Sequence, residues 1–142
     1  MSKVISVILT ILKIIWELPQ VIVSLFVLSF LAIAGDLTIK HERREISFVI
    51  VRSSFIKLSG LSLGLMVFLP MECSDNMLCH EYGHSRQAIF LGWIYLLAVG
   101  IPSLILYIIK KTKHKSSEWY HSKYPENWAD LLGHAKYNFM EK

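Results

Sequence analysis

The feature that most constrains this 142-residue chain is a long apolar run near its start, residues 4–34. Pro19 removes a helical hydrogen bond, so the run should divide near Glu17 and Leu18 into two pieces of about 15 residues. Fifteen helical residues cover about 22 Å, less than a hydrocarbon core of about 30 Å. The run therefore predicts either one bent membrane span or a helical hairpin. Its polar exceptions recur at steps of three and four, which places them on one stripe of a helix: Lys3, Ser6, Thr10, Lys13, Glu17, Gln20 and Ser24.

Composition also favours a membrane protein. Hydrophobic residues make up 54% of the chain and charged residues only 18%, which is apolar for an ordinary soluble domain. The net charge is +4, and the basic residues cluster beside apolar segments, at 40–44, 52–57 and 110–115. This pattern suits lipid headgroups and a cytoplasmic face better than nucleic acid. We therefore expect a lipid bilayer as a partner, no nucleic-acid partner, and a location in the bacterial inner membrane with the functional site facing the cytoplasm.

The rest of the chain predicts an α+β membrane protein that is mostly helical. Residues 36–45 should form a charged loop, and residues 46–51 and 58–69 the two strands of a β-hairpin, because the second segment alternates leucine with Ser62 and Gly64. Residues 78–91 predict a helix that ends at Gly92. Residues 93–109 predict an apolar helix interrupted at residues 100–102, and Pro125 should open a last helix over residues 126–139.

One domain accounts for this pattern. We expect a single membrane-embedded domain, residues 1–142, in which membrane helices occupy 1–35 and the charged loop and β-hairpin occupy 36–70. A metal-binding helix with an apolar helical hairpin should follow in 78–110, and a C-terminal helix with a third ligand in 116–142. At this length there is no room for a separate regulatory module.

The predicted helix over residues 78–91 carries a metal-binding pattern. His80 and His84 lie one turn apart on the same face, so both imidazoles can reach one metal ion at about 2.0 to 2.1 Å. Neutral imidazole suits a borderline-soft ion such as Zn2+. Glu81 can point at a metal-bound water, accept its proton and pass it to a leaving amine. The spacing therefore predicts a zinc site with Glu81 as the general base.

A second acidic pair lies 42 residues beyond His84, at Glu126 and Asp130. They lie one turn apart on the predicted last helix, so one carboxylate can bind the metal and the other can bond the outer nitrogen of a ligand histidine. Three protein ligands plus a water is the catalytic pattern of zinc sites. Two alternatives stay open: Asp130 is the third ligand, or both acids simply complement the dipole of a helix start.

The motifs HEYGH (residues 80–84) and ENWAD (residues 126–130) together resemble the HExxH and ExxAD pair of gluzincin metallopeptidases. The resemblance is to integral-membrane members such as the CaaX prenyl endopeptidase and the bacterial heat-shock membrane protease, which are much larger. The chain is also similar to short bacterial membrane proteins built on HEYGH and a later YxExWAD. The gluzincin resemblance implies zinc ligands, a general base and a residue that orients a ligand histidine: His80, His84 and Glu126; Glu81; and Asp130, respectively.

Residues beside the motifs have predicted roles in handling substrate. Tyr120, His121 and Tyr124 could donate a hydrogen bond to a tetrahedral oxyanion; the alternative is an aromatic belt at a membrane interface. By analogy with gluzincins, the strand over residues 60–69 would pair with an extended substrate backbone by β-augmentation, or be a plain core strand. The substrate-facing positions on this strand would be Leu61, Leu63 and Leu65.

These patterns predict zinc-dependent peptide-bond hydrolysis by a small integral-membrane endopeptidase. Glu81 would act on zinc-bound water, and the substrate would be a peptide or a membrane protein. The alternative is a non-catalytic, zinc-binding membrane scaffold. Cys73 and Cys79 match no zinc-knuckle spacing, and we interpret them as thiols near the site.

Overall fold

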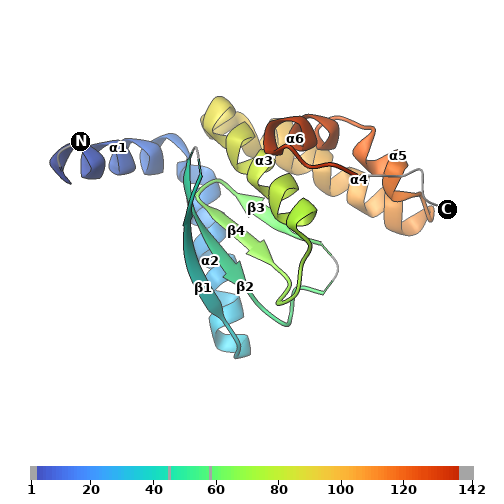
Figure 1. Cartoon of the computed structure of the whole chain (residues 1–142), viewed down its shortest axis with the longest axis horizontal. Coiled ribbons are helices and arrows are strands. Elements are labelled where there is room, and N and C mark those ends of the chain that lie inside the picture. Colours follow the sequence, from blue (N-terminus) through green and yellow to red (C-terminus); the bar gives the residue numbers. More distant parts are fainter. Residues whose placement is uncertain (1–2, 45, 58, 138–142) are drawn as a thin grey trace.

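The computed structural model describes residues 3–44, 46–57 and 59–137 and folds them into a small α+β structure (Figure 1). Within the described residues the elements are α1 (Lys3–Trp16), α2 (Leu18–Ala34), β1 (Thr38–Arg43), β2 (Ser47–Arg52), β3 (Leu61–Leu63), β4 (Met66–Leu69), α3 (Asp75–Leu91), α4 (Ile101–Thr112), α5 (Ser117–His121) and α6 (Glu126–Gly133). Short 3-10 and π-helical turns, Gly92–Ile94 and Leu96–Gly100, join α3 to α4.

The N-terminal apolar run forms two helices that meet at 90°. Pro19 lies in the first turn of α2, where its missing N–H is tolerated, and Glu17 occupies the break. With 14 and 17 residues, α1 and α2 are roughly 21 and 26 Å long. No single helix in the described residues is long and apolar enough to cross a bilayer, although the bent pair from Val7 to Ala34 passes that test as a pair. The predicted fold class, a membrane protein built on kinked or hairpin membrane helices, is therefore wrong.

The prediction of an apolar helical hairpin after α3 is also wrong. The residues from Gly92 to Gly100 continue in helical turns directly into α4, and Pro102 lies in the first turn of that helix. Proline at such a position leaves the helical hydrogen bonds intact, because the first N–H groups of a helix have no partner within it. The segment therefore runs on without reversing.

The predicted β-hairpin is replaced by a four-stranded mixed sheet of order β1-β2-β4-β3. The expected charged loop contains β1, which pairs antiparallel with β2. β2 pairs parallel with β4, and β3 pairs antiparallel with β4. Gly64 takes φ +62°, a left-handed conformation that glycine adopts without steric cost, so the expected strand over residues 60–69 turns back on itself there.

The sheet lies between α2 and α3 (Figure 1). Alternate side chains of its strands point to opposite faces, so it contributes to two apolar clusters. The cluster on the α3 side contains Phe48, Ile50, Val67, Leu69, Leu78 and Tyr82. The cluster on the α2 side contains Leu31, Val51, Leu63 and Phe68.

The two N-terminal helices bury polar residues and expose apolar ones. Glu17, Gln20 and Ser24 from the polar stripe are fully buried, whereas Phe26 is 72% exposed and Ile33 88% exposed. Hydrogen bonds tie this stripe to the rest of the molecule, such as that from Gln20 Nε2 to the Gly92 carbonyl at 2.7 Å. α1 itself extends away from the sheet (Figure 1).

Candidate metal centre

Two glycines let α3 and α6 pack closely. A Cβ atom at Gly83 would overlap the carbonyl oxygen of Ala129, and one at Gly133 would overlap the carbonyl oxygen of Cys79. Each glycine lies four residues from the small residue contacted by the other, Cys79 on α3 and Ala129 on α6, so the contacts line one face of each helix. This packing, which we call the α3–α6 seam, brings the HEYGH and ENWAD motifs side by side.

Each helix of the seam begins near its predicted residue. The Ser74 side chain caps α3 by accepting a hydrogen bond from the Met77 N–H. α6 begins at Glu126, with Pro125 just before the first helical position. It ends at Gly133, so the predicted last helix is shorter than expected, and residues 138–139 lie outside the described residues.

Three predicted ligands converge at the seam. Glu126 Oε2 lies 3.1 Å from His80 Nε2 and 3.4 Å from His84 Nε2. Ligand atoms around a tetrahedral ion with bonds of about 2.0 to 2.1 Å are about 3.3 Å apart, so these separations fit one ion. All three residues are buried, and Glu126 Oε1 has no hydrogen-bond partner among the described residues. His80, His84 and Glu126 therefore form a buried cluster compatible with a metal ion.

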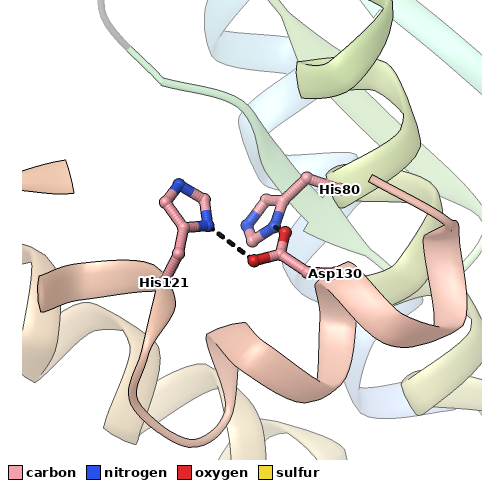
Figure 2. A group of neighbouring side chains, drawn as sticks. All are labelled: His80, His121 and Asp130. Carbon is pink, nitrogen blue, oxygen red and sulfur yellow. Dashed lines mark hydrogen bonds and ion pairs between the residues drawn. The ribbon is translucent and has the colours of Figure 1, made fainter. Parts of the chain in front are cut away.

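The outer nitrogens of both histidines have oxygen partners. His80 Nδ1 lies 2.6 Å from Asp130 Oδ1, and the other oxygen of Asp130 lies 2.9 Å from His121 Nδ1 (Figure 2). His84 Nδ1 lies 2.7 Å from Gln87 Oε1. When each Nδ1–H donates to its oxygen, each Nε2 keeps a lone pair for a metal. Asp130 thus takes its predicted position beside a ligand histidine.

Electrostatics keep the carboxylates of this cluster ionised. Burial alone would raise the pKa of Glu126, but the hydrogen bonds from His80 and His84 outweigh it and hold the pKa well below its ordinary value. Burial also lowers the pKa of His80, but Asp130 and Glu126 outweigh that effect and raise it to about 10. Without a metal, His80 therefore holds a proton at neutral pH, which a metal ion would displace.

Glu81 lies beside the cluster with one oxygen uncommitted. The residue is 5% exposed, and its Oε2 has no hydrogen-bond partner in the described part of the chain. The backbone before β3 lies against it, since a Cβ at Gly60 would be 2.5 Å from Glu81 Oε1. Burial raises the pKa of Glu81. A raised pKa makes proton uptake by this carboxylate easier than for an exposed glutamate.

A cavity of about 1090 Å3 opens beside these residues. Its lining includes Glu81 and both ligand histidines on α3, and side chains from α2, β3, α4 and α5. Two of the three predicted substrate-contacting leucines, Leu61 and Leu63, line it. Leu65 lies in the turn between β3 and β4, outside the lining.

The three aromatic candidates before Glu126 divide between two environments. Tyr120 and His121 line the cavity. Tyr124 is 53% exposed and donates to the Ala98 carbonyl at 2.9 Å, away from the cavity. Burial and the negative charge of Glu126 raise the pKa of Tyr120, so it keeps its proton as a donor. Of the two tyrosines, Tyr120 is the one that lines the cavity.

Gln87 and the two seam glycines were not predicted from the sequence. Gln87 lies three residues after His84, a helical neighbour on the same face, so spacing alone could have identified it. For the glycines the sequence gives only a weaker indication of close helix packing, which is a four-residue spacing between small residues on each of the two helices. Nothing in the sequence states that those two faces meet.

Comparison with models of protein families, with curated proteins and with solved structures finds no match for the chain. The resemblance to gluzincin metallopeptidases therefore stays a prediction based on HEYGH and ENWAD. The meeting of these two motifs at one buried cluster is the observation that supports it.

Proposed function

We propose that this protein is a zinc-dependent peptidase in which His80, His84 and Glu126 hold the metal and Glu81 is the general base. The observation that carries the proposal is the convergence of two imidazole nitrogens and one carboxylate oxygen beside a buried carboxylate that faces the same cavity. Two histidines and a glutamate are a catalytic donor set for zinc, and they leave a coordination position open. Imidazole also favours zinc over oxygen-preferring ions such as magnesium.

The residues around the cavity have different roles in the proposed hydrolysis. Zinc, when bound, supplies the charge that polarises the substrate carbonyl and acidifies a water molecule. Glu81 takes a proton from that water as the water oxygen bonds to the carbonyl carbon. It returns the proton to the amine when the C–N bond breaks. Tyr120 and His121 supply hydrogen bonds to the carbonyl oxygen as it gains charge.

The edge of the sheet gives the substrate a place to bind. β3 is an edge strand, and its Leu61 and Leu63 line the cavity that holds Glu81. An extended peptide adds to such an edge through main-chain hydrogen bonds, with alternate side chains in apolar pockets. We therefore propose an extended peptide segment as the substrate.

The proposals about the protein's surroundings rest on its surface and its charge. The exposed apolar side chains of α1 and α2, such as Phe26 and Ile33, support contact with a lipid bilayer. Location at the bacterial inner membrane, a site facing the cytoplasm and the lack of a nucleic-acid partner stay predictions from the charge pattern.

Glu81→Gln tests the function most directly. The variant should keep one zinc per chain and lose at least about 100-fold of its hydrolysis of β-casein, an unfolded protein substrate, because the proton acceptor is gone. Glu118→Gln is the matched control, since Glu118 is exposed on α5 and should leave the rate unchanged. If the wild-type protein binds zinc but does not hydrolyse β-casein, and Glu81→Gln changes neither property, the zinc-binding scaffold is favoured instead.

A further inference from the structure

One buried side chain joins the two ligand-bearing segments. Gln87 on α3 is fully buried. Its Oε1 lies 2.7 Å from His84 Nδ1, and its Nε2 donates to the Pro125 carbonyl oxygen at 3.0 Å. Pro125 directly precedes the ligand Glu126. A single amide therefore contacts a ligand histidine and the backbone beside the ligand carboxylate.

The contact with Pro125 fixes the direction of the amide. A backbone carbonyl can only accept a hydrogen bond, so the Gln87 NH2 group must point to Pro125 and its oxygen to His84. That oxygen can also only accept, so His84 Nδ1 must carry a proton. His84 Nε2, the nitrogen left to bind a metal, lies 3.4 Å from Glu126 Oε2.

We propose that Gln87 is a positioning residue of the metal centre. It holds His84 in the form protonated on Nδ1, and it fixes the start of α6 so that Glu126 reaches the same ion. The inference rests on the proposed function, because the ion is the one assigned there, but it concerns metal binding rather than peptide hydrolysis.

A neutral partner suits this position. The other ligand histidine, His80, has the carboxylate Asp130 as its partner, and Glu81 and Glu126 are buried nearby. A fourth carboxylate at position 87 would add further buried negative charge, and in the metal-free protein the protonated His80 is already paired with Asp130 and Glu126. The amide provides the acceptor without the charge, and its second half reaches Pro125.

The test compares two substitutions of Gln87 with one control. Gln87→Met keeps the volume and loses both hydrogen bonds, so we expect zinc affinity to fall about 10- to 100-fold. Gln87→Glu keeps the acceptor for His84 and loses the donor to Pro125. Its zinc affinity at high pH should therefore lie between those of the wild type and Gln87→Met. The control is Arg86→Met, which removes the bond from Arg86 Nη1 to the Leu132 carbonyl across the same helix pair and should change zinc affinity by less than about 3-fold.

Two further measurements separate positioning from packing. Nitrogen-15 NMR of the zinc-loaded protein should show His84 protonated on Nδ1 in the wild type, with faster exchange of that proton in Gln87→Met. The pH midpoint of zinc binding should move upward in Gln87→Glu, because the new carboxylate favours the protonated histidine that competes with zinc. Packing alone would shift neither.

The outcomes distinguish this inference from the proposed function. If the wild type binds zinc and Gln87→Met binds it equally tightly, the positioning role is overturned while the peptidase proposal stands. If the wild type binds no zinc, the proposed function is overturned as well. If Gln87→Met does not fold, Gln87→Glu decides: an unchanged pH midpoint overturns the role, and an upward shift supports it.

Discussion

Among the described residues two glutamates are completely buried, and they are in opposite chemical states. Glu126 lies in the α3–α6 seam, where two histidines bond it and hold its pKa well below the ordinary value. Glu17 lies at the break between α1 and α2, where burial raises its pKa to about 7. Both side chains are 0% exposed. Equal burial thus gives an ionised carboxylate in one region and a weak acid in the other, because the neighbouring groups differ.

The neighbours of Glu17 explain its state. Neither of its oxygens has a hydrogen-bond partner among the described residues. Lys13, one turn earlier, is the cation that acts on it, but the lysine Nζ donates to the Ser47 carbonyl at 3.2 Å. The α1–α2 junction is instead held by bonds to backbone carbonyls, such as that from Trp16 Nε1 to Ile89 at 2.7 Å. In the seam, histidine side chains bond Glu126 directly, whereas at the junction the side chains bond backbone carbonyls and leave Glu17 without a partner among the described residues.

Adding a methyl group at the close contact between α3 and α6 should have the largest effect. Gly83→Ala puts a methyl group into the Ala129 carbonyl, and the backbone there cannot move away without separating the helices. We expect a loss of at least about 3 kcal/mol in the free energy of unfolding, and loss of zinc binding. Urea denaturation and metal analysis measure both. Gly100→Ala is the matched control, because its nearest contact would be an ordinary 3.5 Å to the Leu96 side chain. Equal losses in the two variants would refute the close approach of α3 and α6.

Exchanging each buried carboxylate for an amide should separate the two regions. Glu126→Gln should weaken zinc binding by at least about 100-fold, more than the loss of an outer partner, because a charged ligand becomes a neutral one. Glu17→Gln should leave zinc affinity unchanged, since Glu17 lies outside the cluster of ligands. Isothermal titration with zinc measures both. A similar loss in both variants would mean that the two regions are not independent.

The effect of Glu17→Gln on stability should depend on pH. The folded protein binds the Glu17 proton more tightly than the unfolded chain, so stability falls as pH rises from about 4.5 to about 7. The shift corresponds to roughly 3 kcal/mol when the group is ionised. The amide avoids that cost but stays without a partner, so we expect a gain of about 2 kcal/mol at pH 8 and none at pH 4. Denaturation at the two pH values measures the difference, and a gain of the same size at both would contradict the raised pKa.

The smallest effect should come from one bond at the junction. Trp16→Phe loses the hydrogen bond to the Ile89 carbonyl while keeping an aromatic ring, so we expect a loss of about 1 kcal/mol in the free energy of unfolding. Trp93→Phe loses the reciprocal bond to the Ile15 carbonyl and should cost about as much. Thermal unfolding of both variants measures this, with zinc affinity unchanged. No change in either melting temperature would mean that α1 is not held by these bonds.

The sequence allowed much of the candidate site to be predicted and less of the fold. His80, Glu81 and His84 lie on one helical segment, so the spacing along the chain already gave their arrangement. The break near Pro19 was predicted, but the membrane fold built on it was wrong, because spacing along the chain does not give the angle of 90° at which the two short helices meet. The predicted strand over residues 60–69 was wrong because the alternation of Leu61, Leu63 and Leu65 continues through a turn made by Gly64.

By itself the sequence determined the features that depend on a few neighbouring residues: the shared face of His80 and His84 on α3, the break before Pro19, and the pairing of Glu126 with Asp130 on one turn. These follow from the geometry of the local backbone, which is the same in any fold. Only the tertiary structure decided that Glu126 meets His80 and His84, that Gln87 joins His84 to Pro125, and that Tyr120 rather than Tyr124 lines the cavity. Those contacts depend on how closely two helices pack, and that distance is set by glycines and backbone carbonyls some 45 to 55 residues apart in the chain.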